Sequence, residues 1–232
     1  MRKFALFVVL IVMTTAAYAA DPAIGVAEFR NDTSAGWWYG GAGRELAGML
    51  SNELSNTGKF RVVEREKLDK VLEEQDLAEA GRVNKATRAK VGKVTGAKYL
   101  IFGTVSAFEE NTSGGGGGVS FRGINVGGKK QDAYIAIDLR VVDTTTGDVE
   151  WSRTVEARSE AKGINLGLYR GGFGGNLAKH EKTPVGKAIR GVMIEAVDYL
   201  TCAMVDQGDC MDEYDAKEKS RRDKTKKSIK LD

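Results

Sequence analysis

A glycine-rich run that ends in lysine has the residue types of a phosphate-binding loop. Residues 123–129 read Gly-Ile-Asn-Val-Gly-Gly-Lys, and in such loops backbone N–H groups cradle phosphates while the lysine reaches toward them. The next residue is Lys130, where a serine or threonine would hold magnesium, and a strand pattern follows where the loop requires a helix. We therefore do not expect this run to bind a nucleotide.

The remaining reactive side chains do not combine into an active site. His180 is the single histidine, which excludes a two-histidine zinc site and paired imidazole chemistry. The acidic pairs at 73–74 and 109–110 are typical of solvated helix faces and strand ends. We expect no catalytic, cofactor-binding or metal-binding residue, and a protein that is not an enzyme.

Two cysteines are the only thiols in the chain, Cys202 and Cys210. They are closely spaced at the end of a predicted helix, and in an exported chain such a pair is typical of a small disulfide loop. We expect a disulfide between them; the alternative is two unpaired thiols near a helix end.

The amino terminus has the composition of a signal peptide. Arg2 and Lys3 precede a short apolar run, and Ala-Tyr-Ala at 17–19 fits the small-x-small pattern of signal peptidase. The apolar run is too short for a membrane anchor. We expect cleavage after Ala19, export to the periplasm, and no lipid anchor, because no cysteine lies near that site. Without Arg2 and Lys3, basic and acidic residues nearly balance, which argues against a nucleic-acid partner.

The rest of the chain is long enough for one domain with a substantial core. We expect an α/β (α+β) domain at 20–211, with a mixed sheet flanked by helices. The charged residues at 212–232 are predicted to form a frayed helix or a solvated tail. Alternating apolar residues predict strands at 24–29, 60–63, 99–108, 133–142 and 149–157.

Apolar residues at helical spacing predict the helices. One begins at Arg44 and ends before Gly58, which stands where a carboxy-terminal cap is expected. A second lies around 68–72, and Asn84 is the predicted cap of a third that ends near Gly96. Thr183 and Pro184 predict the cap and first turn of a last helix through 205.

Two glycine-rich inserts, at about 109–131 and 160–182, interrupt this order. Loops of this length are uncommon inside compact domains and are usually disordered or functional. Apolar residues in the inserts alternate with small or polar ones, a pattern typical of strands that face lipid on one side and water on the other. Each insert is therefore predicted to be a transmembrane hairpin; flexible glycine loops are the alternative. The alternating residues are Val119, Phe121, Ile124, Val126, Ile164, Leu166 and Leu168.

Three segments resemble the CsgG family of curli secretion channels. They are Phe60-Arg-Val-Val-Glu-Arg65, Ala97-Lys-Tyr-Leu-Ile-Phe-Gly-Thr104, and Ile137-Asp-Leu-Arg-Val-Val-Asp-Thr-Thr-Thr-Gly-Asp-Val149. The resemblance covers nearly the whole mature domain. It implies that the two inserts join those of neighbouring subunits in an outer-membrane barrel above a periplasmic vestibule, and that the chain forms a homo-oligomeric ring.

A loop after the first strand forms the constriction in that family, through which unfolded amyloid subunits pass. In position it matches residues 31–41, where Trp37, Trp38 and Tyr39 would supply an aromatic ring; an aromatic patch docked on the surface is the alternative.

Two functions follow from the sequence. The first is a non-catalytic secretion channel for curli-like polypeptides. The second is a soluble periplasmic adaptor, similar in domain to LpoB, the activator of cell-wall synthases, with an envelope protein as its partner. Ring formation would distinguish them.

Overall fold

The structure is a computed structural model, and it describes residues 21–114, 119–121, 124–126, 129–160, 177 and 182–229. A mixed sheet with strand order β3-β1-β4-β7-β8 forms its centre. The strands are β1 (Ala23–Val26), β3 (Arg61–Val62), β4 (Tyr99–Gly114), β7 (Lys129–Asp143) and β8 (Val149–Glu160). β1 runs parallel to both β3 and β4, whereas β4, β7 and β8 are antiparallel. The short strand β2 (Arg30–Asn31) also pairs with β4.

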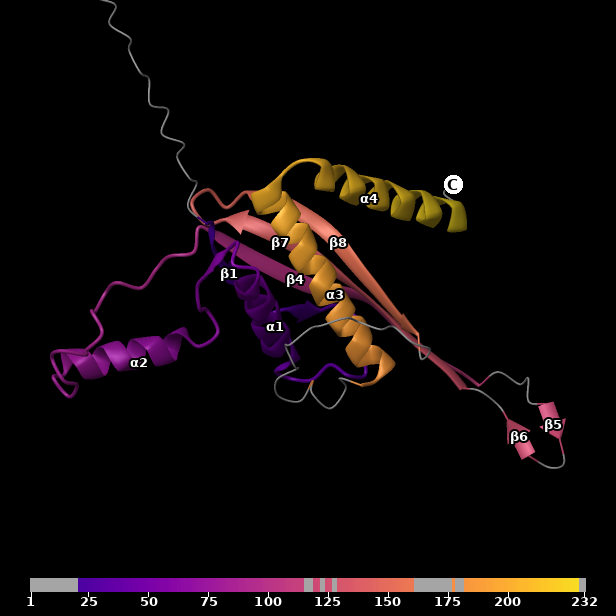
Figure 1. Cartoon of the computed structure of the whole chain (residues 1–232), viewed down its shortest axis with the longest axis horizontal. Coiled ribbons are helices and arrows are strands. Elements are labelled where there is room, and N and C mark those ends of the chain that lie inside the picture. Colours follow the sequence, from indigo (N-terminus) through magenta and orange to yellow (C-terminus); the bar gives the residue numbers. More distant parts are fainter. Residues whose placement is uncertain are drawn as a thin grey trace, which may run out of the picture.

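One face of the sheet carries the hydrophobic core, and α1 (Ala42–Asn56) and α3 (Pro184–Thr201) cover it (Figure 1). The alternation predicted for 133–142 places Ile135, Ile137 and Leu139 on this face, where all three are buried. Neighbouring β4 contributes Ile101 and Val105 to the same layer. The prediction of a mixed sheet flanked by helices is therefore confirmed.

Glycine allows the chain before α1 to pack closely on the sheet. Phe29 lies over Gly103 of β4, where an added Cβ atom would stand 2.2 Å from the ring. The same is true at Gly43, whose Cβ would stand 2.2 Å from the carbonyl oxygen of Phe29. Phe29 is consequently held between β4 and the first turn of α1.

The predicted caps of α1 and α3 are present. Gly58 follows α1 with a φ of +67°, a conformation that glycine adopts without steric cost. The Thr183 side chain accepts a hydrogen bond of 3.1 Å from the N–H of Gly186, and Pro184 occupies the first position of α3.

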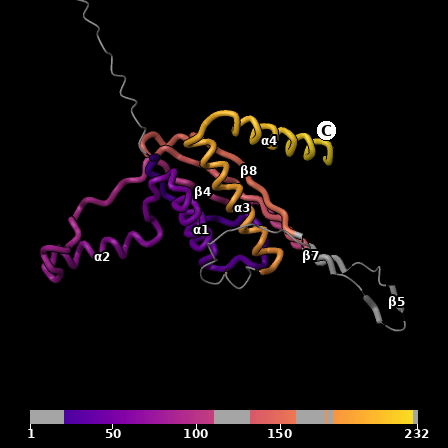
Figure 2. The backbone as a smooth tube through the Cα atoms, viewed as in Figure 1, coloured from indigo at the N-terminus to yellow at the C-terminus, as the bar shows by residue number. Residues whose placement is uncertain are grey.

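The predicted helix at 84–96 is wrong. Asn84 accepts a hydrogen bond from the N–H of Ala86 at 2.9 Å, but only an isolated turn follows. Gly92 has a φ of +71°, and Val91 and Val94 are exposed, so the segment has no apolar face to bury. Together with α2 (Leu68–Glu79) it forms an arm that extends away from the sheet, as the backbone trace shows (Figure 2).

The charged carboxy-terminal residues form a helix, α4 (Asp209–Ser228). A short π-helical turn, Cys202–Asp206, connects it to α3. Tyr214 is the only buried residue of α4 and packs edge-on against Tyr199 of α3, with ring centroids 5.4 Å apart. The helix is thus attached to the domain near its beginning.

Candidate functional site

The loop at 32–41 is an ordered turn. Asn31 ends β2, and its side-chain oxygen accepts hydrogen bonds from the N–H and the hydroxyl of Thr33, at 3.1 and 2.7 Å. The Thr33 hydroxyl in turn accepts from the N–H of Ala35 at 3.2 Å. These bonds are those of Asx and Ser/Thr turns, which replace regular backbone pairing. These hydrogen bonds fix the backbone conformation of the residues that precede Trp37.

Trp37 is packed inside this loop. Its side chain is 6% exposed and meets Phe108 of β4 edge-on, with ring centroids 5.9 Å apart. Trp38 packs against it at 5.5 Å. In the part of the chain that the structure describes, the indole N–H of Trp37 is buried without a hydrogen-bond partner. Trp37 therefore attaches the loop to the strand that leads into the first insert.

Trp38 and Tyr39 pack against the hydrophobic core as well, but each is only partly buried. Of the three aromatic residues predicted for a constriction, the structure thus buries Trp37 and leaves Trp38 and Tyr39 partly exposed. Sequence reasoning did not distinguish Trp37 from Trp38, because the difference depends on Phe108, far along the chain.

The first insert is a continuation of the central sheet. β4 and β7 stay paired past the body of the domain to Gly114 and Lys129, and their ladder projects from it (Figure 1). Beyond it, the strands β5 (Val119–Phe121) and β6 (Ile124–Val126) pair antiparallel. In that pairing Val119 is opposite Val126, and Phe121 is opposite Ile124.

The apolar residues predicted for the second insert, Ile164, Leu166 and Leu168, lie outside the described residues, as does His180. Between positions 161 and 181 of this insert, the structure describes one residue, Leu177. Leu177 is buried, and its N–H donates a 3.0 Å hydrogen bond to the carboxylate of Glu45 in the first turn of α1. Because α1 begins directly after the aromatic loop, Glu45 connects that loop to the chain returning from the second insert.

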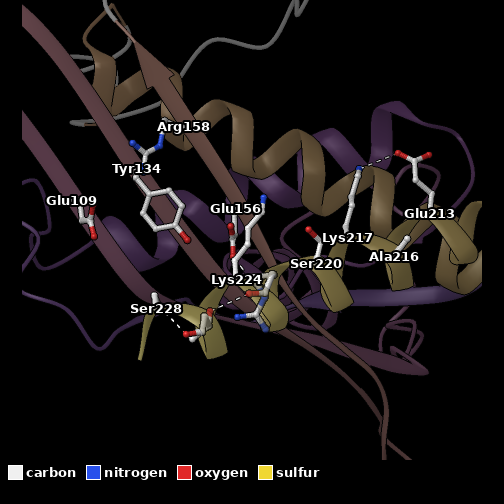
Figure 3. A pocket seen from close by; sticks show the side chains of 12 residues that line it. Glu109, Tyr134, Glu156, Arg158, Glu213, Ala216, Lys217, Ser220, Lys224 and Ser228 are labelled. Carbon is white, nitrogen blue, oxygen red and sulfur yellow. Dashed lines mark hydrogen bonds and ion pairs between the residues drawn. The ribbon is translucent and has the colours of Figure 1, made fainter. Parts of the chain in front are cut away.

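An open groove of about 980 Å³ lies between α4 and the polar face of the sheet (Figure 3). Glu109, Tyr134, Glu156 and Arg158 come from the strands, and α4 supplies Lys217 and Lys224 among others. Many of its charges are paired: Arg221 lies 3.7 Å from Glu156 and 2.7 Å from Glu218, and Lys217 lies 3.2 Å from Glu213. The sequence analysis placed Glu109 on a solvated strand end. In the structure it lines this groove, which the sequence did not predict.

Tyr134 is the most perturbed titratable group of this groove. Burial, with the nearby carboxylate of Glu156, raises the pKa of Tyr134 to about 12, and the guanidinium of Arg158 lies 5.4 Å from the ring. A phenol with such a pKa stays neutral and does not act as a nucleophile at physiological pH. Within the described ranges, no three His, Cys, Asp or Glu side chains are placed to hold a metal ion.

The predicted disulfide is present between Cys202 and Cys210, whose Cα atoms are 6.0 Å apart. It closes the turn that contains Gln207 and Gly208, both at positive φ. Because Cys202 directly follows α3 and Cys210 lies in α4, the bond fixes the direction in which α4 leaves the domain.

Comparison with known proteins identifies the family. Residues 9–229 match the family described as the curli production assembly/transport component CsgG. The chain belongs to the CsgG family. Over 126 residues it is 28% identical to CsgG of Salmonella typhimurium and 27% identical to CsgG of Escherichia coli K12. Each match covers 53% of this chain and 46% of the relative, so the chain spans about half the length of these curated relatives.

The chain also matches solved structures, at lower sequence identity. A hypothetical protein from Chlamydia trachomatis has a TM-score of 0.47 at 14% identity, and the match covers 81% of this chain and all of that one. The carboxy-terminal domain of LpoB from Salmonella enterica has a TM-score of 0.28 at 17% identity, with 61% and 85% coverage. Among the helices that the structure describes, none is long and apolar enough to cross a bilayer.

Proposed function

We propose that this chain is a subunit of a CsgG-type outer-membrane channel through which unfolded, curli-like polypeptides leave the periplasm, with no catalytic step. The observation that carries the proposal is the pairing of β4 with β7, which shifts register once, between Val105 and Ala107, and continues as far as Gly114 and Lys129. It delivers the first insert away from the body of the domain as a ready-formed hairpin (Figure 1). Membership of the CsgG family supports the same assignment.

Physical chemistry then requires an oligomer. Every backbone N–H and C=O group in a bilayer needs a hydrogen-bond partner. Two hairpins from one chain leave unpaired edges, so they enter lipid only by closing a barrel with hairpins of neighbouring copies. A homo-oligomeric ring is therefore part of the proposal.

The loop at 32–41 is the proposed constriction. Trp37 anchors it beside the root of the first insert, and Glu45 connects it to the return from the second. Trp38 and Tyr39, which are partly exposed, are the residues that would meet a passing polypeptide.

The experiment uses two charged substitutions chosen from the alternation of the second insert. Leu166→Arg places a charge at a lipid-facing position of the proposed barrel and is expected to cost about 2 to 4 kcal/mol per subunit near the bilayer midplane. Asn165→Arg places it on the water-filled side and is expected to be tolerated. Outer-membrane fractionation and imaging of detergent-extracted particles compare both variants with the parent. Equal membrane association of the two variants, or a parent that is wholly soluble and monomeric, would refute the channel.

The second candidate is a soluble periplasmic adaptor that binds an envelope protein. The groove between α4 and the polar sheet face favours it, because such a surface is available without any ring. A monomer that is recovered in the soluble fraction, and not with the outer membrane, would support this function.

For both candidates, intact-mass measurement of the exported protein tests cleavage after Ala19 and the absence of an acyl group.

A further inference from the structure

The segment at 82–98, which returns from α2 to β4, is uniformly basic. It carries six Lys or Arg residues and no Asp or Glu. All six are exposed, and no ion pair to any of them is found in the described part of the chain: Arg82, Lys85, Arg88, Lys90, Lys93 and Lys98. Lys98 lies near the carboxylates of Asp143 and Glu150, and the neighbouring helix α2 carries five acidic residues. The basic side chains of the segment are therefore a local concentration of positive charge, which attracts a partner of opposite charge.

The segment is held in place. Gln75 of α2 is buried, and its side-chain oxygen accepts a 3.0 Å hydrogen bond from the N–H of Gly92. Nearer the sheet, Arg65 donates to the carbonyl oxygen of Thr95 at 3.4 Å. A partner therefore meets basic side chains on a fixed backbone and orders less of the protein when it binds.

Apolar side chains lie among these charges. Val91 is 47% exposed and Val94 is 40% exposed, and on α2 Leu72 is 45% exposed. An extended polypeptide can cover such residues with its own apolar side chains while its carboxylates pair with the lysines.

The position of the arm favours a polypeptide over a lipid surface as its partner. The arm and the β4–β7 ladder extend from the body in opposite directions (Figure 1). If the ladder leads to the outer membrane, the arm lies at the end remote from that bilayer. The basic residues at 82–98 are not on a helix, whereas proteins that lie on membrane surfaces commonly place their basic residues on an amphipathic helix.

We infer that the basic part of the arm, residues 82–98, binds acidic, unfolded segments of the exported polypeptide before they enter the channel. The inference rests on the proposed function, since it names the class of polypeptide that the channel takes. Binding is electrostatic and weakens as salt screens the charges.

The test uses the full mature chain and a fluorescein-labelled, disordered peptide of Glu, Gly and Ser, with a matched peptide that has Gln for every Glu. Fluorescence anisotropy at low and physiological ionic strength measures affinity for the parent and for Lys85→Gln/Arg88→Gln/Lys90→Gln. The acidic peptide should bind the parent more tightly than the Gln peptide. The triple variant should bind it about tenfold more weakly at low salt.

The matched control is Lys219→Gln/Lys226→Gln/Lys227→Gln, which removes the same charge from exposed positions of α4. It should bind like the parent. An equal loss in this control, or equal affinity for both peptides, would overturn the inference. Binding of phosphatidylglycerol vesicles, but not of the peptide, through the same three residues would also overturn it, in favour of a lipid surface.

Measuring ring formation and outer-membrane association of the same variants tests the channel separately from peptide binding by the arm. Rings that form normally with no arm-dependent peptide binding would refute the arm and leave the channel. Arm-dependent binding by a protein that forms no ring would refute the channel and leave an acidic polypeptide as the arm's partner.

Discussion

Arg153 of β8 donates a hydrogen bond to the backbone carbonyl oxygen of Tyr214 in α4. Its guanidinium also lies 2.7 Å from the carboxylate of Asp215 and 5.2 Å from the ring of Tyr199. The Arg153 side chain is 11% exposed, whereas that of Asp215 is 69% exposed. One largely buried arginine side chain thus joins the edge strand to the helix that runs beside it.

We predict that Arg153→Met loosens α4. Hydrogen bonds to a charged group contribute about 1.5 to 3 kcal/mol when buried, and the exposed Asp215 lowers the expected loss toward the lower figure. Chemical unfolding should show that loss, and limited trypsin digestion should cut α4 faster. Arg140→Met is the control, because Arg140 is exposed on β7; equal protease sensitivity of the two variants would contradict this role for Arg153.

The disulfide should stabilise the same junction. Closing so short a loop between Cys202 and Cys210 is expected to contribute about 2 to 3 kcal/mol. Thiol labelling of the unfolded, unreduced protein should find no free thiol. Reduction should lower the free energy of unfolding by that amount, and the denaturant midpoint should fall with it. The Cys202→Ala/Cys210→Ala variant should be equally destabilised and insensitive to reductant. A midpoint that does not change on reduction would show that the bond leaves stability unaffected.

Close packing of Phe29 on Gly103 predicts a steric effect. Gly103→Ala places a methyl group where the ring now lies, and overpacking of this kind costs about 1 to 3 kcal/mol. Phe29→Leu should recover part of the loss in the double variant, since the smaller side chain makes room. Gly96→Ala, with open space around its added Cβ atom, should change the unfolding free energy by less than about 0.5 kcal/mol. Additive losses in the double variant would show that the two residues do not contact in the way described.

Elements whose signals are local could be predicted from the sequence. Thr183 and Pro184 mark the start of α3, and the alternation of Ile135, Ile137 and Leu139 identifies a core strand. Each signal lies within a few residues of the structure it specifies. The Cys202–Cys210 pair was predictable for the same reason.

What could not be predicted depends on distant contacts. Asn84 carries a helix-cap signal, yet no helix follows it, because no element that the structure describes buries Val91 and Val94. The docked position of α4 includes a contact between Arg153 and Tyr214, which are 61 residues apart in the sequence. At such positions tertiary packing overrides local preference.

The aromatic loop permits a prediction that separates folding from function. Trp37 is buried against Phe108, so Trp37→Ala should cost about 3 to 5 kcal/mol in unfolding free energy. Trp38 is partly exposed, so Trp38→Ala should cost less than half of that.

If the loop forms the constriction, Trp38→Ala and Tyr39→Ala should raise the single-channel conductance of rings in planar bilayers, because they widen the pore without unfolding the loop. The matched control is Trp151→Ala, which removes a partly buried indole from β8, away from the loop, and should leave the conductance unchanged. Unchanged conductance in Trp38→Ala and Tyr39→Ala rings that assemble normally would exclude the loop as the constriction and leave it as a docked aromatic patch.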